Sequence, residues 1–258
     1  MSEPHPTLEA RISERWGKGV TRRAIGIEPG PGRIVVSLAD HSHSMACTVH
    51  HDGRLVTGID ADFRRYTLNH CPAAVVPLRE LIGQPLGIST VDFYAGGRAR
   101  RNCTHMLDLA WLGLRHASRQ QGERLYEIEV PDSLTGRFEA RLTSNGTEVL
   151  AWKVDNGTIA APAPFAGQSL WRGFLRWATR EAGLGEEAIE HALVLHKGVF
   201  MAGSRRNDLP TGPLSEGNKK ALQGVCFGYD QERIDQAIGN EGMFRDFTHD
   251  RAGLLSFR

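Results

Sequence analysis

Three two-residue turn signals constrain the fold of this chain more than any other feature of its sequence. They are Asp52-Gly53, Asn145-Gly146 and Asn156-Gly157. Such pairs favour tight turns between antiparallel strands, because both residues readily adopt a positive φ. The segments beside them have the residue pattern of strands and cover residues 45–51, 54–60, 138–143, 148–154 and 158–161. The chain is therefore predicted to contain an antiparallel hairpin and, later, an antiparallel meander.

Segments with helical or strand character are interspersed with these turns. Apolar periodicity predicts helices over residues 72–81, 103–120, 168–181, 186–196 and 230–238. Further strands are expected over residues 33–40, 87–94 and 125–130. Because hairpins and helices alternate in no regular strand–helix–strand order, the fold class is predicted to be α+β rather than a doubly wound sheet. We expect antiparallel hairpins and a meander packed with helices.

The domain organisation is predicted from one composition change. Residues 1–32 are polar and end in Gly30-Pro31-Gly32, which indicates a flexible N-terminal arm. Residues 33–258 are expected to form a single α+β catalytic domain, with halves at 33–121 and 122–258. A chain of this length corresponds to one large or two small domains.

Charge and composition limit the partners of this chain. It has 258 residues with a net charge of +1, which argues against a nucleic-acid partner. Its 31 basic residues are 26 Arg and five Lys. No apolar run reaches the ~18 residues of a membrane span, and no signal-peptide core is visible, so we expect a cytoplasmic protein with no membrane partner. The four cysteines form no C-x-x-C pair and are expected to be free thiols. A homodimer stays open.

The Asp52-Gly53 hairpin carries the first candidate site. With a two-residue turn, His43 would lie opposite Asp62, and His41 opposite Arg64. His41, His43 and Cys47 would then share a face with Asp60, Asp62 and Arg64. A histidine held by a carboxylate is suited to general acid–base catalysis, and the same groups could bind a divalent metal. A solvated, charge-paired hairpin end is the structural alternative.

The second candidate site is the start of the helix expected at residue 103. A thiol at a helix N-terminus has a lowered pKa, so Cys103 is a candidate ligand or nucleophile and His105 a candidate base. Arg98, Arg100 and Arg101 precede them and would attract an anionic oxygen. The alternative is a buried structural cysteine beside a packing histidine. Because no dinucleotide fingerprint, P-loop, nucleophile elbow or zincin motif is present, no cofactor is expected.

Several motifs resemble the uncharacterised bacterial DUF2889 family. They are Asp40-His41, Cys71-Pro72, Cys103-Thr-His-Met106, Gly224-Val-Cys226-Phe227 and Arg245-Asp-Phe247. The resemblance covers most of residues 33–255, with Asn102 and Met243-Phe244 at positions where the family pattern has glycine and Gly-Ser. More loosely, the chain is similar to cofactor-independent lyases that remove formaldehyde from lignin-derived aromatic dimers.

These observations together predict a carbon–carbon lyase that acts on a small aromatic anion. Its catalytic residues would be His41, His43, Asp62 and His105, and the substrate would be bound by Arg64, Arg101, Cys103 and Arg245. Two alternatives stay open. One is a metal-dependent hydrolase or lyase that uses His41, His43, Asp62 and His105, and the other is a non-enzymatic metal or cluster carrier.

Overall fold

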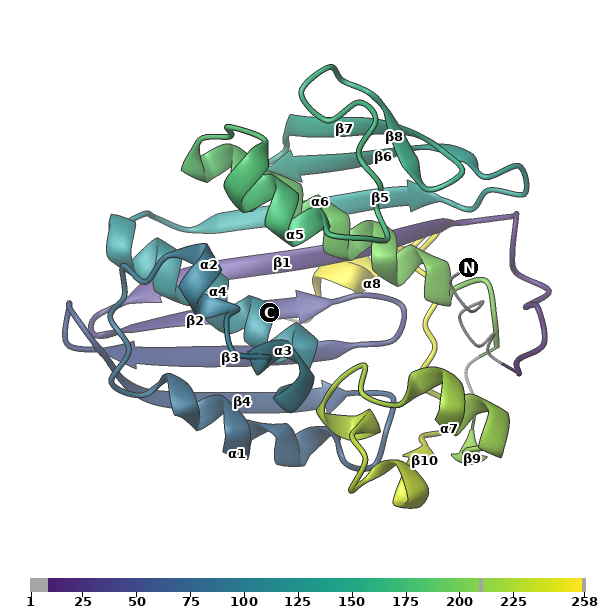
Figure 1. The fold of residues 1–258 in the computed structure, drawn as a ribbon, viewed down its shortest axis with the longest axis horizontal. Helices are drawn as coiled ribbons and strands as arrows, with labels where there is room; N and C mark the ends of the chain where they lie inside the picture. Colours follow the sequence, from purple (N-terminus) through teal and green to yellow (C-terminus); the bar gives the residue numbers. More distant parts are fainter. Residues whose placement is uncertain (1–8, 209–210, 257–258) are drawn as a thin grey trace.

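The computed structural model describes residues 9–208 and 211–256, and one antiparallel sheet of eight strands dominates it (Figure 1). The strand order is β4-β3-β2-β1-β5-β6-β7-β8, so β1 and β5 lie at the centre. The strands are β1 (Val20–Gly30), β2 (Arg33–Ala39), β3 (Ser44–His51), β4 (Val56–Arg65), β5 (Arg124–Pro131), β6 (Arg137–Ser144), β7 (Thr147–Asp155) and β8 (Thr158–Ala161). Together with the helices described below, this sheet confirms the α+β class.

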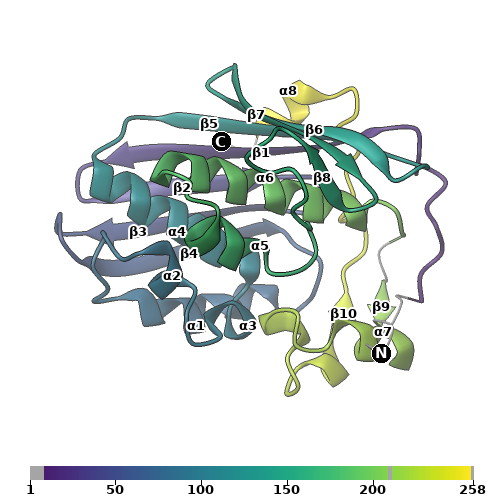
Figure 2. The same cartoon turned by 45° about the horizontal axis from the view of Figure 1, so that its top comes forward.

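Two long helices cover one face of the sheet. Helix α4 (Thr104–Arg119) packs on β2 and β3, and α6 (Glu186–Ser204) packs on β5 and β6, while both also contact β1. The short helix α8 (Arg251–Leu255) packs against β1 on the opposite face (Figure 2). Each half of the chain thus supplies four strands followed by one long helix, and the two helices meet over the centre of the sheet.

Glycines let both long helices approach the sheet closely. A Cβ atom on Gly113 of α4 would lie 2.9 Å from Val49 Cγ2 of β3, and one on Gly198 of α6 would lie 2.5 Å from Ile128 Cγ2 of β5. Both distances are shorter than a normal van der Waals contact. The helix backbones can therefore lie at this depth only because these positions lack a side chain.

Shorter elements surround this core. The helices are α1 (Val75–Leu78), α2 (Thr90–Phe93), α3 (Arg98–Arg101), α5 (Phe174–Arg176) and α7 (Glu216–Leu222). Strands β9 (Gly212–Pro213) and β10 (Ile238–Gly239) form a small second sheet. The remaining turns of helix are Cys71–Ala74, Arg79–Leu81, Trp177–Glu181, Phe227–Tyr229 and Ile234–Gln236. None of the helices in the described part combines the length and apolar character that crossing a membrane requires.

The flexible arm expected over residues 1–32 is wrong where the structure describes it. Residues 20–30 form β1, a central strand with partners on both sides, and Gly30-Pro31-Gly32 belongs to the turn into β2. The strand contains Arg22 and Arg23. Two adjacent charged residues are typical of an exposed surface segment, so the sequence did not indicate a central strand. Arg23 is in fact buried, and its charge is paired within the fold. Residues 1–8 of the expected arm lie outside the described residues.

The other predictions of helices and strands are confirmed in part. The helix expected over residues 103–120 and the four-strand meander are confirmed to within one residue at each end. The strand expected over 87–94 is wrong, because Ser89 accepts a hydrogen bond from the backbone N–H of Asp92 and starts helix α2. Of the helix expected over 168–181, only residues 174–181 are helical.

Candidate active site

The candidate site begins at the tight turn between β2 and β3. Asp40 Oδ1 accepts hydrogen bonds from the backbone N–H groups of Ser42 (2.9 Å) and His43 (2.8 Å). From β4, Arg65 Nη2 donates to the carbonyl oxygens of Asp40 (2.6 Å) and His43 (2.9 Å). Because these bonds fix the backbone on both sides of the turn, the side chains of Asp40 and His43 are held in one orientation.

A buried ion pair anchors the same turn to the centre of the sheet. Arg23 Nη1 lies 2.7 Å from Asp40 Oδ2, and both side chains are almost completely buried. Burial alone would raise the pKa of Asp40, but His43 and the Arg23 guanidinium hold it well below its usual range. Asp40 is therefore a carboxylate at neutral pH, and its second oxygen is available to His43.

Two imidazole rings meet beside this carboxylate. His43 Nδ1 lies 3.1 Å from Asp40 Oδ1, which assigns the Nδ1 proton to this bond and leaves Nε2 of His43 available. His105, near the start of α4, lies with its ring centroid 4.0 Å from that of His43, and its Nε2 is 3.2 Å from Met201 Sδ of α6. Burial, together with the nearby His43, lowers the pKa of His105 well below its usual range. His105 is therefore neutral.

His41 lies on the other side of the turn and has different partners. Ser204 Oγ donates to the carbonyl of Met201 (2.7 Å), so its 2.8 Å contact with His41 Nε2 requires the imidazole to donate. Burial lowers the pKa of His41 to about 4. The ring thus ties the turn to the C-terminal end of α6 as a neutral donor, which makes His41 a positioning residue.

The predicted partnership between His43 and Asp62 is wrong. Asp62 pairs with Ala46 across the hairpin, three residues further along β3 than His43. The turn is longer than two residues, since Asp52 Oδ1 accepts from the backbone N–H of Leu55, and the ladder shifts by one more residue at His50/His51. A register change of an odd number of residues moves side chains to the other face of the sheet.

Asp62 and Arg64 accordingly lie away from the histidine cluster. The two side chains are about half exposed and form an ion pair of 2.7 Å with each other. Arg101 is exposed and pairs with Glu80 at 3.2 Å. Arg245 comes close only through its backbone N–H, which donates to the His41 carbonyl at 2.8 Å. None of these three guanidinium groups joins the cluster.

Cys103 is the N-cap residue of α4 but does not have the chemistry expected for it. Its thiol is buried, and burial raises its pKa well above the usual value. The helix N-terminus does not compensate for this loss of hydration. Cys103 is therefore a buried thiol of the core, as the structural alternative held, and its neighbour His105 is the residue of this motif that reaches the site.

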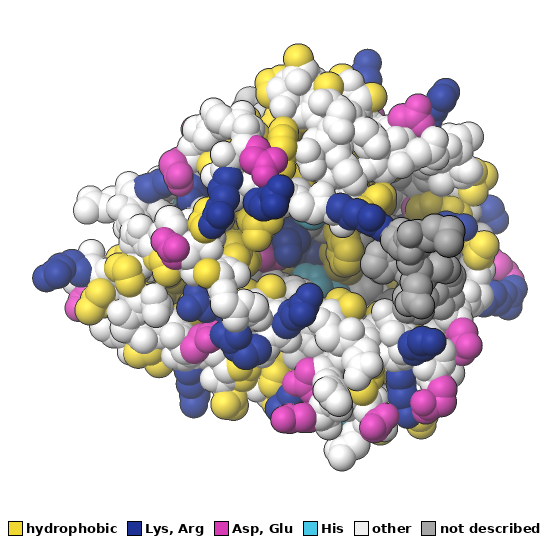
Figure 3. Space-filling model, in the orientation of Figure 1, with side chains coloured by type: hydrophobic (Ala, Val, Ile, Leu, Met, Phe, Trp, Pro, Cys, Tyr) yellow, Lys and Arg dark blue, Asp and Glu magenta, His cyan; other side chains and the backbone are white. Residues whose placement is uncertain are grey.

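A cavity of about 170 Å³ lies next to the histidine cluster, between α4, α6 and β1. Arg23 joins the two, because its guanidinium pairs with Asp40 and also lines the cavity. A space-filling view shows a hollow on this face of the molecule, with histidine and basic side chains at its bottom (Figure 3). The apolar walls are formed by Ile25, Ala99, Leu109, Trp111, Leu112, Leu175, Leu193 and Val194.

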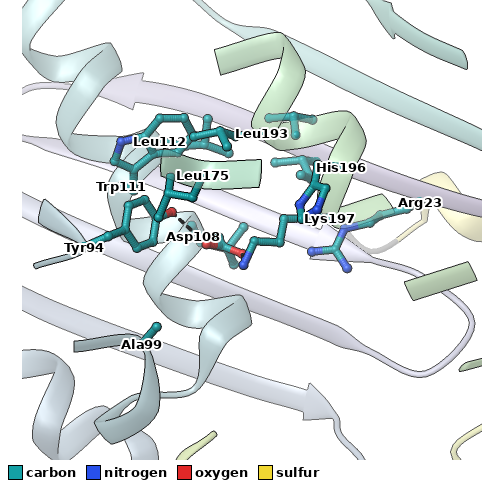
Figure 4. Close-up of a pocket in the computed structure, with 13 residues that line it drawn as sticks. Arg23, Tyr94, Ala99, Asp108, Trp111, Leu112, Leu175, Leu193, His196 and Lys197 are labelled. Carbon is teal, nitrogen blue, oxygen red and sulfur yellow. Dashed lines mark hydrogen bonds and ion pairs between the residues drawn. The ribbon is translucent and has the colours of Figure 1, made fainter. Parts of the chain in front are cut away.

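The polar lining of the cavity is a short hydrogen-bonded chain (Figure 4). Tyr94 donates its hydroxyl proton to Asp108 Oδ1 at 2.7 Å, and Lys197 Nζ lies 3.1 Å from Asp108 Oδ2. Burial, followed by the charge of Asp108, raises the pKa of Tyr94 well above its usual value. His196 completes the polar lining.

Sequence reasoning missed Asp40 and Arg23 as site residues. The signal for Arg23 is a charged residue inside an apolar strand pattern, and the signal for Asp108 is a carboxylate in the apolar run Leu107–Leu109 of a helix. Buried charges of this kind need a partner, so each one points to a second residue elsewhere in the chain. Lys197 is that partner for Asp108.

No protein-family model and no curated protein matches this chain. The resemblance to the DUF2889 family thus stays a prediction that its motifs carry, and the looser similarity to the formaldehyde lyases stays a prediction without a motif of its own.

Proposed function

We propose that this protein is a cofactor-independent carbon–carbon lyase that removes formaldehyde from a lignin-derived aromatic compound by acid–base catalysis. The observation that carries the proposal is the buried Asp40–His43 pair, in ring contact with His105 beside an apolar cavity. The choice of reaction and substrate comes from the resemblance of the chain to such lyases.

His43 is the base in this proposal. Asp40 holds the Nδ1 proton, so Nε2 has the lone pair, and the carboxylate stabilises the imidazolium that forms when Nε2 accepts a proton. Arg23 and the two backbone N–H groups keep Asp40 ionised and in place. A base of this kind needs no metal or organic cofactor.

The reaction proceeds by a retro-aldol-like fragmentation of a γ-hydroxymethyl group. His43 takes the hydroxyl proton, the Cβ–Cγ bond breaks as the Cγ–O double bond forms, and formaldehyde leaves. The electron pair of the broken bond forms a Cα–Cβ double bond and expels the oxygen at Cα, which leaves as a phenol from a phenylcoumaran and as water from a diarylpropane once it is protonated. The His43 imidazolium returns its proton to that oxygen, and His105, a neutral ring in contact with His43, adds no second positive charge beside it. One proton moves within the substrate, so no oxidant or reductant is needed.

A metal-dependent hydrolase or lyase is the second candidate. Asp40, His43 and His105 each offer one ligand atom, and these atoms lie within 4.8 Å of one another. However, Asp40 Oδ2 is already paired with Arg23, and Oδ1 accepts three hydrogen bonds. A divalent ion would have to displace these partners and lie beside a guanidinium, so the acid–base proposal is favoured.

The test is release of formaldehyde from dimers of the phenylcoumaran and diarylpropane types that bear a γ-hydroxymethyl group. Purified protein is expected to release one formaldehyde per product molecule, before and after treatment with a chelator. A His43→Gln variant is expected to lose about 10²–10⁴-fold in rate, the usual contribution of a general base. His50→Gln is the matched control, because His50 of β3 forms an exposed pair with Asp60 of β4.

Folded protein that releases no formaldehyde from any of these dimers would contradict the proposal. Activity that disappears with the chelator and returns with one added divalent ion would favour the metal-dependent candidate instead.

A further inference from the structure

The cavity beside the histidine cluster has the size of a single aromatic ring. Its volume is about 170 Å³, and its walls are the aliphatic and aromatic side chains of α4, α6 and β1. An engineered apolar cavity of about 150 Å³ is large enough to bind benzene. One ring of a two-ring substrate therefore fits here, and Arg23, which lines the cavity and pairs with Asp40, connects it to the histidine cluster.

The cations of the cavity are already compensated. Lys197 is paired with Asp108, and Arg23 is paired with Asp40. A carboxylate entering this apolar space would be a third negative charge without a matching cation, and burying an unpaired charge is costly. Lys197 retains further N–H donors after it binds Asp108, since an ammonium group has three. The lining thus favours a neutral group that accepts a hydrogen bond.

His196 adds an acceptor to the same cavity. Its Nε2 donates to the carbonyl oxygen of Leu170 at 2.7 Å, and its ring stacks on Phe174 with centroids 4.3 Å apart. Burial lowers the pKa of His196 to about 4, so the ring is neutral and its proton is on Nε2. Nδ1 then carries a lone pair, and no donor from the described residues bonds to it. Such a lone pair requires a donor from the ligand.

We propose that this cavity is a subsite for a neutral ring with a free phenolic hydroxyl group, which donates to His196 Nδ1 and accepts from Lys197 Nζ. A phenol combines a hydrogen-bond donor and an acceptor in one neutral group. An aryl ether has no donor, and a carboxylate has no donor and carries a negative charge. This inference rests on the proposed aromatic substrate and narrows it to dimers in which the buried ring has a free hydroxyl.

The test measures binding of three single-ring probes by titration calorimetry at pH 7. The probes are 4-methylphenol, 4-methylanisole and 4-methylbenzoate, which share a ring and differ in the polar group. We expect the phenol to bind about ten-fold more tightly than the anisole, the effect of one hydrogen bond, and the benzoate not to bind.

Two variants assign the binding to the cavity. His196→Phe retains an aromatic ring against Phe174 but removes the acceptor, so the affinity for the phenol should fall to that for the anisole. Leu193→Phe fills the apolar wall and should abolish binding of both. The proposal is overturned if benzoate binds as well as the phenol, or if Leu193→Phe binds the phenol like the unaltered protein.

The catalytic proposal and the subsite can fail separately. His43 does not line the cavity, so the His43→Gln variant should bind the phenol with unchanged affinity while its turnover is lost. Selective phenol binding without formaldehyde release from any dimer would support the subsite and contradict the lyase. Formaldehyde release at equal rates from dimers with free and methylated phenols would overturn the subsite and leave the lyase.

Discussion

Strand β3 has a histidine–aspartate pair at each end, and the two pairs differ in everything except their residue types. His43 and Asp40 are 3.1 Å apart and nearly inaccessible to solvent. His50 and Asp60 are closer, at 2.7 Å, but their side chains are 39% and 71% exposed. The shorter contact is thus the exposed one. Burial, the Arg23 ion pair, the ring contact with His105 and the nearby cavity distinguish the pair at His43. The comparison teaches that surroundings rather than contact distance make such a pair suitable for catalysis.

The largest expected difference between the two pairs is in stability. Asp40→Asn retains the shape of the side chain but leaves the buried Arg23 guanidinium without a countercharge, so we expect a loss of about 3–5 kcal/mol. Asp60→Asn removes an exposed partner and should change the free energy of unfolding by less than about 0.5 kcal/mol. Urea unfolding followed by circular dichroism measures both. Equal effects of the two substitutions would remove the distinction between the pairs.

The next effect is a dependence of stability on pH that comes from the buried end of β3, where His41 and His43 lie. The pKa of His41 is about 4 in the folded protein and near 6.5 when unfolded, so below pH 6.5 the unfolded chain binds a proton that the folded protein does not. His41 should therefore lower stability by up to about 3 kcal/mol as the pH falls from 6.5 to 4. Asp40 stays ionised in this range because its pKa is well below normal.

Unfolding free energies measured across this pH range check the effect of His41. His41→Gln retains a donor for Ser204 and should lose part of the decline towards low pH, while His50→Gln should retain all of it. A His41→Gln variant with the same decline as the unaltered protein would show that the buried end does not control it.

A smaller effect is expected at Cys103, beside the buried end. Cys103→Ala removes one buried sulfur atom and should cost about 1 kcal/mol, while formaldehyde release continues because the thiol takes no part in proton transfer. In the folded protein, iodoacetamide should not label this thiol, since its pKa is raised. Rapid labelling of Cys103 at pH 7 followed by loss of activity would instead support Cys103 as a site residue.

The smallest effect belongs to the exposed side of the hairpin. Asp62→Asn removes the charge of a half-exposed carboxylate paired with Arg64. We expect unchanged formaldehyde release and a change in unfolding free energy of less than about 0.5 kcal/mol. A large loss of activity would support the hairpin register expected from the sequence instead of the one in the structure.

Much of the fold could be predicted because its signals are local. The apolar stripe of α4 and the Asn-Gly turns of the meander lie within a few residues of the structure they specify. The central strand β1 could not be predicted, because its burial depends on β2 and on β5, about 100 residues further along the chain. The charge of Arg23 is acceptable in that strand only because Asp40 reaches it.

The candidate site, like the fold, could be predicted only where its signals are local. His43 and His105 were both named from the sequence, and the structure brings their rings into contact. Their partner could not be named, because a longer turn and a ladder irregularity move Asp62 out of reach. The substrate-binding arginines were sought near the motifs in sequence, whereas the cations that line the cavity, Arg23 and Lys197, come from β1 and α6.

By itself, the sequence determined the antiparallel α+β character, the long helix expected over residues 103–120 and three candidate histidines, of which His43 and His105 meet in the structure. Periodicity and turn chemistry act over short stretches of chain, so they can be read without knowing the fold. Only the tertiary structure decided which histidine is buried, which carboxylate orients it and where a ring could bind. Burial and pairing of charge depend on strand register and on segments that meet from distant parts of the chain, so the surroundings that make His43 differ from His50 exist only in the folded protein.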